Sequence, residues 1–152
     1  RSIEPATAMA ERFRGQGALD VIDAERVDFT HERPDVAVLF LTLMFMRVHT
    51  RATFVDKLLD AVRPGGAVII VDKGYIEEPR AQVACKAAQL AGKLRAGTPG
   101  DSYTQKELAL RGEQRPTCPA TIAQHARERG YAVQEIFRFG EFFGLLCVRT
   151  TL

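Results

Sequence analysis

The stretch LDAVRPGGAVIIVDK, residues 59–73, decides how this chain folds. It opens with the end of a helical pattern, in which apolar residues recur on one face over 50–62. Gly65 and Gly66 follow Pro64 and predict a tight turn, because glycine adopts backbone conformations that other residues avoid. Residues 67–71 are then all apolar, which is typical of a strand in a parallel sheet with both faces covered. The stretch therefore predicts helix, turn and buried strand.

The flanking segments extend this alternation. A second stretch, 35–41, is continuously apolar after Asp35 and predicts another strand buried on both faces. Upstream, residues 2–4 fit a strand end, 5–14 a helix and 18–22 a short strand. Together these segments predict an α/β fold with a mostly parallel sheet.

The carboxyl-terminal half continues the pattern and then reverses it. A long helix is predicted over 77–94, with four candidate packing positions, Val83, Ala87, Leu90 and Leu94, and a shorter helix over 121–129. Strands over 132–139 and 142–149 are joined only by Gly140 and Glu141, so they are expected to pair as an antiparallel hairpin. Residues 95–119 are polar and rich in glycine and proline. They predict a flexible or substrate-side insertion with a short helix near 104–111, inside a single partial domain over 1–152.

Composition excludes several classes of protein. Apolar residues make up 46% of the 152, charged residues 26%, and the net charge is +2, which is typical of a soluble globular domain. This balance favours neither nucleic acid nor membrane, and no apolar run reaches the roughly 20 residues of a membrane span. Cys85, Cys118 and Cys147 lack the spacing of a metal site or a disulfide framework. We therefore expect no metal, no membrane and a reducing, cytoplasmic location.

Several segments, in order along the chain, resemble class I S-adenosylmethionine (SAM)-dependent methyltransferases. They are IEPATAM at 3–9, IDA at 22–24, the strand and loop at 35–45, the stretch at 59–73, and the closing hairpin FGEFFGLL at 139–146. The resemblance implies a Rossmann-like class I methyltransferase fold with a carboxyl-terminal antiparallel hairpin. It also implies SAM as the cofactor.

The resemblance assigns four cofactor-binding positions. Glu4 matches the acidic residue that accepts hydrogen bonds from the ribose hydroxyls of SAM, a role that suits a carboxylate because it only accepts. Asp23 and Ala24 match the loop that holds the adenine, Asp23 through its side chain and Ala24 through its backbone N–H. Phe40 falls where many relatives carry Asp or Asn beside the cofactor. An apolar ring at this point departs from the family pattern.

Within this superfamily the chain is most similar to the carboxy-SAM synthase branch, over residues 39–73 and 101–104. That likeness places Tyr103 on the substrate side. It also implies that Arg111 or Arg115 is the counterpart of an arginine that recognises the carboxylate of the modified cofactor. A plain surface arginine in a polar loop is the alternative for either position.

One expected feature of the family is absent from the sequence. The family cradles the methionine part of SAM with a glycine-rich loop between its first strand and first helix, and no glycines precede Glu4. Gly15 and Gly17 follow a helix and precede a strand, the reverse of the required order. We therefore expect that the first strand and this loop are missing, that residues of the parent protein or a second copy in a homodimer cover the gap, and that this chain alone is inactive.

Three functions remain open. The leading one is a SAM-dependent methyltransferase with an unidentified small-molecule or tRNA-linked acceptor. The others are a carboxy-SAM synthase for tRNA wobble-uridine modification, and a non-catalytic methyltransferase fold that acts as a scaffold. Positioning an acceptor beside an electrophilic methyl group accounts for much of methyl transfer, so no catalytic triad is expected. His49 is the one histidine near a strand end that is worth testing as a base.

Overall fold

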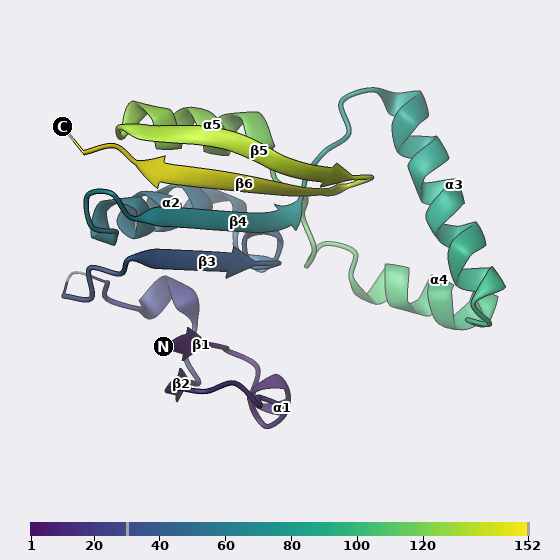
Figure 1. Cartoon of the computed structure of the whole chain (residues 1–152). Helices are drawn as coiled ribbons and strands as arrows, with labels where there is room; N and C mark the ends of the chain where they lie inside the picture. The colour runs from purple at the N-terminus through teal and green to yellow at the C-terminus, as the bar shows by residue number, and fades with distance from the viewer. Residues whose placement is uncertain (30, 152) are drawn as a thin grey trace.

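The computed structural model describes residues 1–29 and 31–151, and its centre is a mixed sheet with strand order β3-β4-β6-β5 (Figure 1). β3 and β4 are parallel, whereas β6 pairs antiparallel with both β4 and β5. The strands are β3 (Val36–Phe40), β4 (Ala67–Lys73), β5 (Tyr131–Phe139) and β6 (Phe142–Arg149). The predicted parallel pair and closing hairpin are confirmed.

The turn before β4 depends on its two glycines. Gly65 has a φ of 76°, in the left-handed region that favours glycine. A Cβ on Gly66 would lie 2.6 Å from the carbonyl oxygen of Asp35, which leads into β3. The turn therefore brings the backbone of β4 against the start of its parallel neighbour more closely than any side chain allows.

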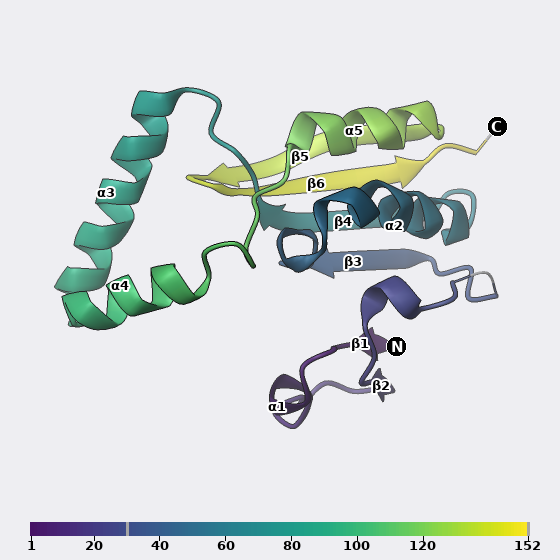
Figure 2. The ribbon, with the colours of Figure 1, turned by 180° about the vertical axis from the view of Figure 1, so that it is seen from behind.

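Two helices cover one face of this sheet (Figure 2). They are α2 (Val48–Ala61) and α5 (Pro119–Glu128). The apolar face predicted over 50–62 is buried against the sheet, and the core contains Phe54, Val55, Leu58, Leu59, Val62, Val68, Ile70, Ala126, Phe143, Leu145 and Cys147. This layer is the body of the protein.

The other face of the sheet carries apolar side chains at the surface. Val36, Val38 and Phe40 are 54%, 59% and 67% exposed. The prediction that β3 is buried on both faces is therefore wrong for this face, because no helix of the described residues packs over it (Figures 1 and 2).

A small separate unit lies beside the β3 edge (Figure 1). It contains β1 (Ser2–Ile3) and β2 (Leu19–Asp20), which are parallel, together with α1 (Thr7–Ala10) and the 3₁₀ helix η1 (Ala24–Arg26). The helix predicted over 5–14 is confined to one turn. Among the described residues no strand joins this sheet to β3, and the break falls where the family resemblance places a further strand.

Helices α3 (Pro79–Arg95) and α4 (Gly100–Ala109) form an arm that extends away from the sheet beyond the β5–β6 hairpin (Figure 1). Neither helix buries a side chain. The packing face predicted for α3 is wrong, because Val83, Leu90 and Leu94 are 69%, 37% and 48% exposed and Ala87 is exposed too. The helix predicted near 104–111 begins and ends earlier, as α4.

Candidate active site

The parallel strands β3 and β4 end at one edge, where ligands bind in open α/β sheets. Leu41, directly after β3, has a φ of 53°, and its N–H donates to the Val71 carbonyl at 2.7 Å. A non-glycine residue in the left-handed region is uncommon and is found at functional turns. This turn leads the chain into the 3₁₀ helix η2 (Leu43–Phe45) at the edge.

Asp72 is the buried acidic group of this edge. Its side chain is fully buried, and its two oxygens accept hydrogen bonds from the backbone N–H groups of Leu43 and Lys73, each at 2.7 Å. Burial raises the pKa of Asp72 above its ordinary value, against these hydrogen bonds and the nearby charge of Arg51. The carboxyl group therefore holds η2 over the end of β4.

Arg51, on α2, joins two loops above the same edge. Its guanidinium donates to the carbonyl oxygens of Met46 and Pro116 at 3.2 Å and of Arg115 at 2.8 Å. The first of these belongs to the loop after β3, and the other two precede α5. The guanidinium fork thus fixes the loops that frame the site.

A cleft of about 710 Å³ lies between the arm and this edge. Tyr103 and Arg111, both predicted on the substrate side, line it together. Lys73 and Lys86 line it as well, so the wall carries three cationic side chains. The structure brings these two predicted residues into one cleft.

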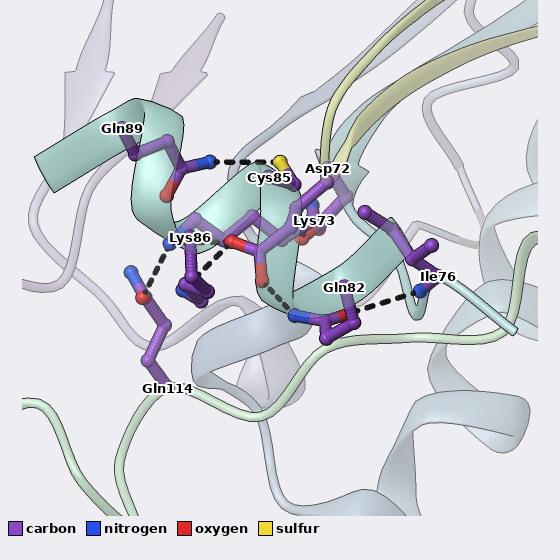
Figure 3. A network of polar contacts seen from close by, with 9 residues as sticks. Asp72, Lys73, Ile76, Gln82, Cys85, Lys86, Gln89 and Gln114 are labelled. Carbon is purple, nitrogen blue, oxygen red and sulfur yellow. Dashed lines mark hydrogen bonds and ion pairs between the residues drawn. The ribbon is translucent and has the colours of Figure 1, made fainter. Parts of the chain in front are cut away.

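The buried carboxylate of Glu141, in the turn between β5 and β6, lines this cleft, and Figure 3 shows three side chains around it, Gln82, Lys86 and Lys73. It accepts hydrogen bonds from Gln82 Nε2 at 2.6 Å and Lys86 Nζ at 2.9 Å, and Lys73 Nζ lies 3.9 Å away. Burial favours a raised pKa for Glu141, but the hydrogen bonds from Lys86 and Gln82 and the lysine charges hold the pKa below its usual value. The group therefore stays ionised and paired.

The other two residues predicted near the substrate lie in a separate pocket. His49 and Arg115 line a cavity of about 540 Å³ with Phe45 and Met46. Arg115 donates its backbone N–H to the Met44 carbonyl at 2.8 Å and its side chain to the Gly112 carbonyl at 3.1 Å. Arg111 and Arg115 thus face different cavities, and His49 is not brought to the cleft that Tyr103 lines.

The predicted cofactor residues follow the ends of three strands. Glu4 comes after β1, and its Oε1 accepts the N–H of Ala6 at 2.9 Å. Asp23 comes after β2 and accepts the N–H of Glu25 at 3.0 Å, which starts η1, while Ala24 packs partly buried against the core. Phe40 ends β3 with its ring largely exposed. Their roles toward SAM stay predictions.

Sequence reasoning included Asp72 only in the structural stretch 59–73 and missed Arg51 and Glu141. An acidic residue at the end of an all-apolar strand, or inside the apolar hairpin FGEFFG, was the available signal for the two carboxylates. Arg51 had no such signal.

Within the described residues, no group of three His, Cys, Asp or Glu side chains could hold a metal ion. None of the helices described there is long and apolar enough to cross a membrane.

Comparison with known proteins connects this geometry to a family of enzymes. The chain is 26% identical over 147 residues to a carboxy-S-adenosyl-L-methionine synthase from Aeromonas hydrophila, covering 94% of this chain and 59% of the relative. It is also 26% identical over 155 residues to the enzyme of that name from Vibrio cholerae, covering 95% of this chain and 63% of the relative. The chain thus spans about three fifths of the length of these relatives, and its resemblance to the carboxy-SAM synthase branch is confirmed.

Solved structures confirm the predicted fold. An O-methyltransferase family protein from Burkholderia thailandensis superimposes with a TM-score of 0.60 at 19% identity, covering 95% of this chain and 39% of that one. Human N-acetylserotonin methyltransferase, in complex with SAM, gives 0.56 at 12% identity, covering 95% and 38%. No family model matches the chain. The chain has a Rossmann-like class I methyltransferase fold.

Proposed function

We propose that the protein to which this chain belongs is a SAM-dependent methyltransferase whose acceptor is unidentified. The observation that carries the proposal is a similarity to SAM-dependent proteins over at least 94% of the chain, to methyltransferases in fold and to carboxy-SAM synthases in sequence. The framed carboxyl edge of β3 and β4 supports it, because this is the edge at which open α/β sheets bind their ligands.

The residues present fit the nucleoside part of SAM. Glu4 would accept hydrogen bonds from the ribose hydroxyls, since a carboxylate has more acceptor positions than its one bond to Ala6 uses. Asp23 would accept from the adenine amine while the Ala24 N–H donates to the ring. When bound, SAM supplies a methyl group on a positively charged sulfur, so the chain's own task is to bind and orient.

The acceptor would bind in the cleft between the arm and the sheet. Tyr103 and Arg111 would orient the acceptor there. The three cationic side chains of the wall exceed its two carboxylates, Glu107 and Glu141, which favours a group that carries negative charge. His49, in its separate pocket, would act as a base only for an acceptor that reaches the Phe45–Met46 loop. Orientation in line with the methyl group then provides much of the rate.

A carboxy-SAM synthase is the second candidate, favoured by the sequence similarity to the carboxy-SAM synthases of Aeromonas hydrophila and Vibrio cholerae. In that case the product would be a carboxylated SAM used for tRNA wobble-uridine modification, and Arg111 or Arg115 would bind its carboxylate. Mass spectrometry of SAM incubated with the full-length protein and a cell extract, which supplies both methyl acceptors and carboxyl donors, distinguishes the candidates. A methyltransferase converts SAM to S-adenosylhomocysteine, whereas a carboxy-SAM synthase adds the mass of a carboxyl group to the cofactor.

The third candidate is a methyltransferase fold that acts only as a scaffold. It differs from the enzymes in the glycine-rich loop, which an enzyme needs for the methionine part of SAM. An intact loop in the parent sequence favours an enzyme, and its true absence favours the scaffold.

Calorimetric titration with SAM tests the proposal. We expect micromolar binding by the full-length parent protein, and weak or absent binding by the 152-residue chain, which offers only the ribose and adenine contacts. Absence of heat and of a thermal shift for the full-length protein would overturn both enzyme candidates. Micromolar binding by the 152-residue chain would contradict the role given to the glycine-rich loop.

A further inference from the structure

The arm formed by α3 and α4 is not held by apolar burial. Neither helix buries a side chain, and the apolar residues of α3 are at the surface. Most helices in proteins depend on tertiary packing of an apolar face for their place and stability. The position of this arm must therefore depend on other contacts.

Those contacts converge on one carboxylate at the root of the arm (Figure 3). Gln82 and Lys86, one turn apart on α3, both donate to Glu141, whose side chain is only 3% exposed. Gln82 also accepts the backbone N–H of Ile76 at 3.3 Å, which ties the start of α3 to the segment after β4. The arm covers the carboxylate that holds it.

The returning end of the arm reaches the same place. Gln114, after α4, accepts a hydrogen bond from Lys73 Nζ at 2.9 Å. Lys73 lies 3.9 Å from the Glu141 carboxylate and 5.5 Å above the centre of the Phe142 ring. Both ends of the arm are thus connected through Glu141 and its neighbouring lysine.

The hairpin turn fits closely against α3 at this point. Gly140 has a φ of 57°, and a Cβ there would lie 2.8 Å from Cys85 Sγ. Cys85 is half-buried, in contrast to the exposed Cys118 and the buried Cys147. A thiol that lies between arm and hairpin reports whether the two are in contact.

We propose that Glu141 is a latch that holds the α3–α4 arm as a lid over the cleft, and that loss of its contacts lets the arm move away as a unit. When the arm is closed, Tyr103 and Arg111 line the cleft, so release of the latch removes both side chains from it. This device goes beyond the proposed function and is independent of SAM.

The contacts of the arm let it open without unfolding the body. Removing one partner of a buried ion pair leaves an uncompensated buried charge, which is more costly than the intact pair. Opening the arm returns that charge to water without exposing the core, because the arm contributes no buried side chain. The arm therefore opens before the body unfolds.

Labelling of the native cysteines in the 152-residue chain tests the latch. We expect Glu141→Gln to speed modification of Cys85 by an uncharged thiol reagent at least about tenfold, while Cys147 keeps its rate, because local opening is separate from global unfolding. Glu135→Gln is the matched control: Glu135 pairs with Arg138 on the exposed β5, and its loss should change neither rate. Peptide mass spectrometry assigns each site.

A second variant excludes a direct electrostatic effect on the thiol. Lys86→Met removes a positive charge where Glu141→Gln removes a negative one, so their direct effects on the reactivity of Cys85 oppose each other, whereas both release the arm. We expect faster labelling of Cys85 in both. An unchanged Cys85 rate in Lys86→Met, or Cys85 and Cys147 accelerating equally in either variant, overturns the latch. Lys86→Met decides the matter if Glu141→Gln does not fold.

Discussion

The body and the arm of this protein are stabilised in different ways. In the body, α2 and α5 bury a continuous apolar layer against the sheet. In the arm, no side chain of α3 or α4 is fully buried, and a few polar contacts to Glu141 and Lys73 hold these helices in place. The difference shows that one chain can combine a body held by apolar burial with an arm held by a few polar contacts, and the proposed latch at Glu141 depends on this contrast.

Shortening a side chain at the centre of the body should give the largest change in the free energy of unfolding. Phe143 is fully buried in β6, so Phe143→Ala should lower the free energy of unfolding by about 3–5 kcal/mol. Val83→Ala, on the exposed face of α3, should change it by less than about 0.5 kcal/mol. Urea unfolding followed by circular dichroism measures both. A comparable loss for Val83→Ala would mean that the arm packs as firmly as the body.

Replacing a glycine by alanine should change the free energy of unfolding in opposite directions in the body and in the arm. Gly66→Ala places a methyl group against the Asp35 carbonyl and should cost about 1–3 kcal/mol of unfolding free energy. Gly92→Ala, inside α3 with no atom near the added carbon, should instead favour helix by about 0.5–1 kcal/mol. Thermal unfolding of the two variants should move in opposite directions, and a shared sign would contradict the open surroundings of Gly92.

Two buried carboxylates should give smaller pH dependences of opposite sign. The pKa of Asp72 is raised in the fold, so its stabilising contribution is complete below its usual value of 3.8 and is lost as pH rises through the folded pKa. The pKa of Glu141 is lowered, so its contribution is present above its usual value of 4.5 and is lost as pH falls through the folded pKa. Lys86 and Lys73 face Glu141, and Glu107 and Tyr103 lie near Lys86.

The contribution of each carboxyl group is the unfolding free energy of the wild type minus that of a variant that lacks the group. The unfolding free energy of the wild type minus that of Asp72→Asn should fall as pH rises from acid, while the difference for Glu141→Gln should rise. Urea unfolding across a pH series supplies both curves. Parallel curves would show that the two carboxyl groups have the same environment.

The body could be predicted because its determinants are local. The helical period over 50–62, the glycine turn at 65–66 and the two-residue connection at 140–141 each specify their element within a few residues. The arm could not be predicted in this way. An amphipathic pattern at Val83 and Leu90 indicates a helix but does not reveal what covers it, and here nothing among the described residues does.

Candidate residues for the site could be named from the sequence, but their grouping in space could not. Tyr103 and Arg111 line one cleft because α4 returns the chain from the end of the arm toward the sheet, while Arg115, four residues further, faces the pocket of His49. Spacing along the chain does not encode that separation. Glu141 escaped notice because its importance depends on partners 55 and 59 residues away.

The central claim is that the carboxyl edge of this fold binds SAM, with Glu4 on the ribose. The most direct measurement is calorimetric titration of the full-length protein with SAM, comparing the wild type with Glu4→Gln and with Glu11→Gln, an exposed glutamate after α1. We expect Glu4→Gln to weaken binding about tenfold or more, since hydrogen bonds to charged groups contribute about 1.5–3 kcal/mol, and Glu11→Gln to leave it unchanged. Equal affinities for all three proteins, or no binding by the wild type, would contradict the claim.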